Sequence, residues 1–106
     1  MSSERAIGVF DSGVGGLAVV RSLTERLPEE ELVYLGDTAR LPYGSKSAAT
    51  VLRYSRLSTR FLLERGVKMI LVACNTASAL ALDDLKRECE IPILGAVVPG
   101  DRKSVV

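Results

Sequence analysis

Four short apolar runs recur along the chain, and longer segments with helical character separate them. The runs are Ala6–Phe10, Glu31–Gly36, Lys68–Ala73 and Ile91–Val98. The third run, KMILVA, is nearly continuous in apolar residues, which is typical of a strand covered on both faces. The pattern predicts four strands.

Three segments between these runs favour helices: Leu17–Leu27, about Lys46–Arg65, and Asn75–Cys89. Pro28 should end the first helix, and Gly66 should cap the C-terminal end of the second. Strands that alternate with helices predict right-handed crossovers. We therefore expect an α/β fold with a doubly wound, mainly parallel sheet and flanking helices.

Two helical details can be read from the spacing of side chains. In the second helix, Tyr54, Leu57 and Phe61 stand at i, i+3 and i+7, which predicts that they share one face. In the third helix, Asn75 or Thr76 could cap the N-terminus.

Polar residues follow the predicted strands directly. They are Asp11-Ser12 after the first, Asp37-Thr38 after the second, Cys74-Asn75-Thr76 after the third and Pro99-Gly100 after the fourth. In doubly wound sheets, ligands bind beyond the carboxyl ends of the strands. We expect these residues to share one rim, the place where such sheets bind ligands.

Composition narrows the classes of protein that fit. The chain has 106 residues, of which 47% are hydrophobic and 25% charged, with a net charge of +1. That balance is typical of one small globular domain or part of one. Acidic and basic residues are interspersed, so no basic face is available for phosphates, and we expect no nucleic-acid partner.

The sequence also bears on the location of the protein and on metal binding. No apolar run approaches the ~20 residues of a membrane helix, and the first ten residues lack the order of a signal peptide. We expect a cytoplasmic protein with no membrane partner. Two cysteines and no histidine favour reduced thiols over a disulfide framework and give no convincing metal site.

Asp11 and Cys74 are the two candidates for chemistry. Asp11 closes an apolar strand, so its carboxylate must find a partner or face a cleft, and it could act as a general base or cap the following turn. Cys74 precedes a predicted helix, whose N-terminus favours the thiolate form of a cysteine. The alternative for Cys74 is an inert buried thiol, as most free cysteines are.

The glycine-rich stretch after the first strand and Cys89 can both be explained by structural roles. The stretch DSGVGG could cradle a phosphate, but it lacks the full spacing of a nucleotide-binding motif. Its glycines, Gly13, Gly15 and Gly16, could equally serve a tight turn and close helix packing. Cys89 lies between Glu88 and Glu90, whose charges disfavour a thiolate, so we interpret it as structural.

Four segments together resemble the N-terminal part of bacterial glutamate racemases. They are FDSGVGGL, GDTARLPYGSKS, VACNTASA and GAVVPG, in this order. The resemblance covers residues 6 to 100. It implies interconversion of L- and D-glutamate without a cofactor, supplying D-glutamate for peptidoglycan, in an enzyme that could be a homodimer at full length.

The resemblance also implies roles for individual residues. The family uses two cysteines on opposite faces of the substrate, and Cys74 matches the first of them. Asp11 matches the aspartate that binds the substrate ammonium and assists proton transfer. The matching substrate-binding positions are Asp11, Ser12, Tyr43, Gly44, Asn75 and Thr76.

The chain departs from the family pattern in its second half. The second catalytic cysteine has no counterpart, and family members are over twice as long, with a second α/β domain. We interpret residues 1–100 as the N-terminal part of the first domain of a two-domain racemase, and we expect this part alone to be inactive. Residues 101–106 do not continue the resemblance, and they can be encoded by a stretch that reads like sequencing-adapter DNA, which would make them a sequencing artefact.

Other functions stay open at this point. The chain could be a half-domain that binds an acidic amino acid without turnover, or one that pairs with a full-length racemase through an uncovered sheet edge. A thiol-redox role for Cys74 is a third alternative, although no nearby resolving cysteine accompanies it.

Overall fold

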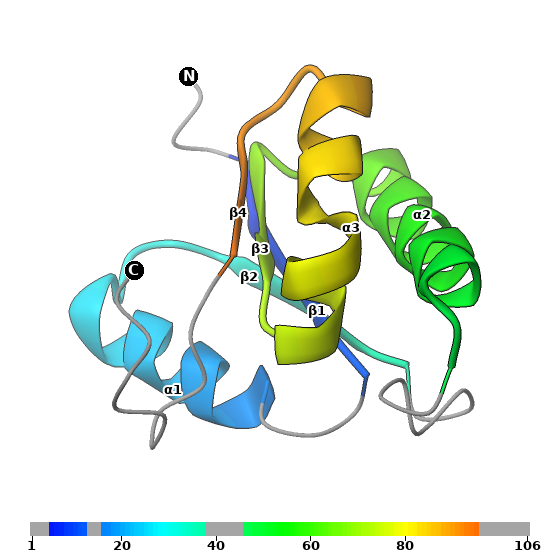
Figure 1. The fold of residues 1–106 in the computed structure, drawn as a ribbon. Coiled ribbons are helices and arrows are strands. Elements are labelled where there is room, and N and C mark those ends of the chain that lie inside the picture. Colours follow the sequence, from blue (N-terminus) through cyan, green and yellow to red (C-terminus); the bar gives the residue numbers. More distant parts are fainter. Residues whose placement is uncertain (1–4, 13–15, 38–45, 96–106) are drawn as a thin grey trace.

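The computed structural model describes residues 5–12, 16–37 and 46–95 (Figure 1). Strands and helices alternate through these residues. In chain order they are β1 (Ile7–Asp11), α1 (Gly16–Arg26), β2 (Leu32–Gly36), α2 (Ala48–Glu64), β3 (Met69–Val72), α3 (Asn75–Glu88) and β4 (Ile93–Gly95). The predicted order of elements is confirmed.

The four strands form one parallel sheet in the order β2-β1-β3-β4. Ile7 at the start of β1 pairs with Leu32 on one side and with Met69 on the other. Ile70 of β3 in turn pairs with Ile93 of β4. Because every pairing is parallel, the carboxyl ends of all four strands lie at the same edge of the sheet. The predicted α/β fold is thus confirmed.

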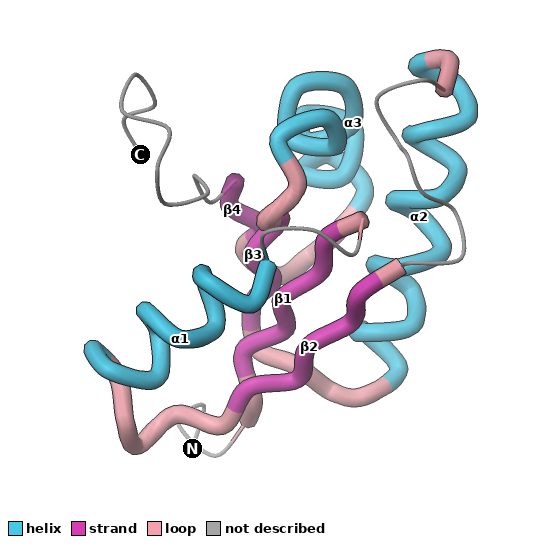
Figure 2. Tube along the Cα trace, turned by 90° about the horizontal axis from the view of Figure 1, so that it is seen from below, coloured by secondary structure: helices cyan, strands magenta, loops and turns pink. Residues whose placement is uncertain are grey.

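Helices cover both faces of the sheet. Alternate residues of a strand point to opposite faces, and the core accordingly divides into two clusters. Ile7 and Val9 pack in one cluster with Val19 of α1. Phe10 and Ile70 pack in the other, which includes residues of α2 and α3. Figure 2 shows α1 on one side of the strands and α2 with α3 on the other, the doubly wound arrangement.

The buried face of α2 is not the face that carries Leu57 and Phe61. These two side chains, predicted to share one face with Tyr54, are 43% and 36% exposed. The residues that α2 buries are Val51, Ser55, Ser58, Thr59 and Leu62. Short hydroxyl side chains suit this face, because α2 packs closely against both α3 and the sheet. The cost is polar burial: the hydroxyls of Ser55 and Thr59 have no hydrogen-bond partner among the described residues.

Local signals define the ends of α2. The N-cap is Ser47, whose Oγ accepts a hydrogen bond from the backbone N–H of Thr50 at 3.1 Å. Past the other end, Gly66 has a φ of +76° and donates its N–H to the carbonyl of Leu63 at 3.0 Å. The predicted role of Gly66 at this terminus is confirmed.

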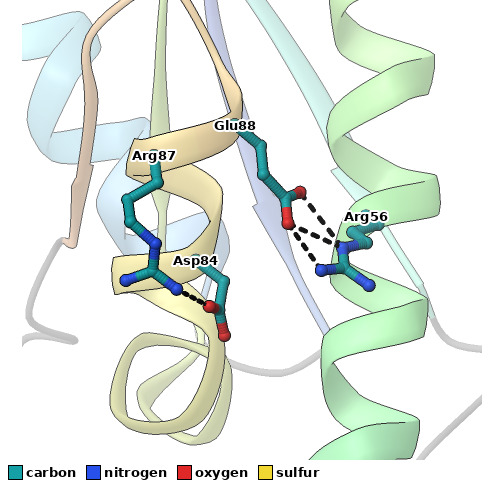
Figure 3. Close-up of polar contacts among 4 residues, drawn as sticks. All are labelled: Arg56, Asp84, Arg87 and Glu88. Carbon is teal, nitrogen blue, oxygen red and sulfur yellow. Dashed lines mark hydrogen bonds and ion pairs between the residues drawn. The ribbon is translucent and has the colours of Figure 1, made fainter.

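An ion pair links α2 to the C-terminal end of α3. The guanidinium of Arg56 donates from both Nε and Nη2 to the carboxylate of Glu88, with a shortest N···O distance of 2.5 Å (Figure 3). Within α3, Arg87 pairs with Asp84. Among the described residues, no helix is both long enough and apolar enough to cross a bilayer.

Candidate functional site

The carboxyl ends of β1, β2 and β3 bring Ser12, Asp37 and Cys74 side by side. The N–H of Asp37 donates to the carbonyl of Asp11 at 3.0 Å, and the N–H of Ala73 donates to the carbonyl of Phe10 at 2.8 Å. The strand register therefore continues past the last paired residues. It places Ser12 between Asp37 on one side and Cys74 on the other, so this part of the expected rim is present. Thr38, Pro99 and Gly100, which were also expected at the rim, lie outside the described residues.

Asp11 is the last residue of β1 and has no exposed surface. Its Oδ2 accepts a hydrogen bond from the backbone N–H of Gly16 at 2.5 Å, and its Oδ1 accepts one from the hydroxyl of Tyr34 at 2.9 Å. Donors to both oxygens compensate for burying a carboxylate. The side chain is thereby directed toward the N-terminus of α1.

Tyr34 is a site neighbour that the sequence did not single out. It lies in β2 opposite Val9, two residues before the position that pairs with Asp11. Burial, the hydrogen bond to Asp11 and the negative charge of that carboxylate together raise the pKa of Tyr34 to about 12. The phenol therefore stays protonated and remains a donor throughout the physiological range.

Cys74 caps α3, a role that we expected of Asn75 or Thr76. Its backbone is extended, and its Sγ accepts a hydrogen bond from the N–H of Ala77 at 3.5 Å. The carbonyl of Cys74 also accepts the N–H of Ser78 at 2.9 Å. The expected cap was wrong because α3 already begins at Asn75, so the residue before it, Cys74, occupies the N-cap position. Cys74 is 5% exposed and joins the apolar cluster under α2 and α3.

The other predicted site residues divide into two groups. Ser12 is buried at the rim, whereas Asn75 is exposed and Thr76 half-buried in the first turn of α3. The first N–H groups of a helix have no partner within the helix, so this turn can receive an anion. Tyr43 and Gly44 lie outside the described residues.

Asp11 ends β1, whereas Cys74 follows the neighbouring strand β3 as the N-cap of α3, and the two side chains belong to opposite faces of the sheet. Asp11 contacts Gly16 of α1 through its carboxylate. Cys74 packs with residues of α2 and α3. The rim therefore carries a carboxylate from one face and a thiol from the other, with Ser12 beside the thiol. In such an arrangement the carboxylate can bind a cationic group of a ligand, and the thiol can exchange a proton with a different atom of the same ligand.

Cys89 lies far from this rim. It is the C-cap of α3, whereas Cys74 is the N-cap of the same helix, so about 20 Å separates them at 1.5 Å per residue. Burial, followed by the charge of Glu88, raises the pKa of the Cys89 thiol. Both observations support the structural interpretation of Cys89. Within the described ranges, no three His, Cys, Asp or Glu side chains gather as a metal site would require.

Comparison with known proteins identifies glutamate racemases as relatives of this chain. The glutamate racemase of Geobacter metallireducens is 52% identical over 100 residues, which cover 94% of this chain and 37% of the relative. The crystal structure of glutamate racemase from Thermus thermophilus, in complex with β-chloro-D-alanine, superposes with a TM-score of 0.84 at 54% identity, over 88% of this chain and 36% of that one. The glutamate racemase of Francisella tularensis, in complex with D-glutamate, gives 0.83 at 45% identity, over 90% and 36%.

These matches cover only part of each relative. The chain spans little more than a third of the length of the relatives it matches, and it corresponds to their N-terminal part. No family model matches the chain.

Proposed function

We propose that this chain, which matches the N-terminal part of glutamate racemases in sequence and fold, supplies one half of the active site of a cofactor-independent glutamate racemase. The observation that carries the proposal is the shared rim, where the register of β1 and β3 sets Ser12 beside Cys74 and next to buried Asp11. Relatives are crystallised with D-glutamate and with L-glutamate, which supports glutamate as the substrate. The setting would be D-glutamate supply for peptidoglycan in the cytoplasm.

In this proposal Cys74 is the proton acceptor for one enantiomer. Its sulfur already accepts the N–H of Ala77 at the N-terminus of α3, and helix N-termini stabilise negative charge. The thiolate would take the α-proton of glutamate, and the electron pair of the C–H bond would pass to the α-carbon and its carboxylate. The first turn of α3, with Asn75 and Thr76, could receive that carboxylate.

Asp11 would hold the substrate ammonium. Its carboxylate is fixed by Gly16 and Tyr34, so it would meet a cationic group with little loss of side-chain entropy. The return of a proton to the opposite face of the α-carbon needs a second acid. Cys89 is too distant for that role. We therefore expect the second thiol to come from a segment that corresponds to the part of the relatives not matched by this chain.

A hybrid enzyme would test this proposal. Residues 1–95 of this chain would replace the aligned segment of the Geobacter metallireducens racemase, and circular dichroism would follow the optical activity of glutamate. We expect the hybrid to racemise both enantiomers, and Cys74→Ser to reduce turnover by at least about 10³-fold, as loss of an essential nucleophile or base does. Ser22→Ala, in the middle of α1, is the matched control and should leave turnover unchanged.

Two outcomes would count against the proposal. A folded hybrid without racemase activity would mean that the rim does not form half of the site. A Cys74→Ser hybrid with full activity would show that the sulfur is not the proton acceptor. The 106-residue chain alone is expected to show no racemisation, and glutamate binding without turnover would favour a half-domain that only binds its ligand.

A further inference from the structure

The contacts around Asp11 assign a role to a residue outside the matched site positions. Tyr34 is the one tyrosine of β2, and the rest of that strand is aliphatic or glycine. Its ring packs with the cluster under α1, while its hydroxyl reaches diagonally across to Asp11. A phenylalanine would fill the same apolar space, so packing alone does not explain the hydroxyl.

Two glycines leave room for this hydrogen bond. A Cβ added to Gly36, the partner of Asp11 in the register, would lie 2.8 Å from the hydroxyl oxygen of Tyr34. A Cβ added to Gly16 would overlap the Asp11 carboxylate and lie 2.8 Å from Cε1 of the Tyr34 ring. Neither glycine has a positive φ, because Gly66 is the only described residue that does. Space around the Tyr34–Asp11 pair, and not backbone conformation, requires glycine at both positions.

We infer that Tyr34 is a positioning residue of the proposed racemase site, which holds the Asp11 carboxylate in one orientation toward the substrate ammonium. The inference rests on the proposed function. The Gly16 N–H and the Tyr34 hydroxyl each bind a different carboxylate oxygen, so together they prevent rotation about the last bond of the side chain.

The pair itself can be tested in the 106-residue chain. Tyrosine ionisation would be followed by absorbance in the wild type, Asp11→Asn and Tyr34→Phe. The wild-type titration should include the Tyr34 phenol with a pKa of about 12, a component that Tyr34→Phe removes and Asp11→Asn lowers. In ¹⁵N–¹H spectra the Gly16 amide should shift in both variants and stay in place in Tyr54→Phe, the matched control on α2. If the raised tyrosine pKa is the same in Asp11→Asn as in the wild type, the inference is overturned.

The role toward substrate can be tested in the hybrid enzyme. Tyr34→Phe should raise KM for glutamate about tenfold, the effect of losing one hydrogen bond to a charged group, with a smaller change in kcat. Tyr54→Phe should change neither value. An unchanged KM in Tyr34→Phe would overturn the inference while leaving the proposed function intact. An inactive wild-type hybrid would overturn the proposed function and this role with it, and the absorbance titration would still report separately whether Tyr34 binds Asp11.

Discussion

The backbone of Gly16 lies directly against the carboxylate of Asp11, and its N–H donates to Oδ2 at 2.5 Å. No side chain fits between them, because a Cβ at this position would overlap the carboxylate. We predict that Gly16→Ala lowers the free energy of unfolding by about 1–3 kcal/mol, the usual cost of overpacking a buried position. Urea denaturation would measure the change.

Leu17→Ala provides the control for this prediction. Leu17 is the next residue of α1 and is 68% exposed, so its truncation should change the stability by less than about 0.5 kcal/mol. Equal stability of Gly16→Ala and the wild type would show that the chain can move α1 away from Asp11 at no cost. That result would contradict the close approach described above.

The capping role of Cys74 can be separated from its chemistry. Cys74→Ala removes the acceptor for the Ala77 N–H, and we expect it to cost about 0.5–2 kcal/mol, as the loss of an N-cap does. Cys74→Ser retains an acceptor and should be closer to the wild type in stability. Thermal unfolding of the 106-residue chain would compare the three. If alanine and serine are equally stable, the sulfur does not contribute to the cap.

The buried hydroxyl of Thr59 should cost stability. Its Oγ1 has no partner among the described residues, although the side chain is buried. Thr59→Val keeps the shape and removes the polar atom, and we expect it to stabilise the chain by about 1 kcal/mol. Thr24→Val is the matched control, since Thr24 is exposed and donates to the carbonyl of Val20. A destabilised Thr59→Val would indicate that its hydroxyl finds a partner in solution.

The Arg56–Glu88 pair predicts a pH dependence of stability. The hydrogen bond from Arg56 is the main cause that lowers the pKa of Glu88 below its ordinary value of 4.5. A lowered carboxylate pKa stabilises the fold above the ordinary value, and this contribution disappears as the pH falls through the folded-state pKa. Glu88→Gln should therefore decrease Tm slightly near neutral pH and have no effect in strong acid.

Salt and a second glutamate test the origin of that effect. Both partners are largely exposed, so high salt should weaken the difference between Glu88→Gln and the wild type. Glu64→Gln, at an exposed position of the same helix as Arg56, is the matched control and should leave Tm close to the wild-type value. A Tm difference that persists below the folded-state pKa would mean that Glu88 acts through packing.

Much of the fold follows from short-range patterns in the sequence. The continuous apolar run at β3 and the glycine after α2 indicated their elements directly, because each signal depends on a few adjacent residues. The face of α2 could not be obtained this way. Leu57 and Phe61 are the larger hydrophobic residues, but Ser55 and Thr59 are small enough for the close approach of α3, and that contact depends on residues distant in sequence.

The candidate site shows the same division. Asp11 and Cys74 were found because each follows an apolar run, which is a local signal. Tyr34 was not found, because its relation to Asp11 depends on the register between β1 and β2. That register places residues that are 23 positions apart within one hydrogen bond. A single sequence does not contain it.

The alternation of side chains along β1 has a consequence for mutation by insertion or deletion. Loss of one residue inside this strand would exchange its two faces, turning the Asp11 carboxylate into the apolar layer that contains Cys74 and directing Ser12 toward α1. The core would then contain an unpaired charge, and the rim would lose its anion at the same time. Selection for a stable fold would therefore remove variants with such a register shift before any selection on chemistry could act.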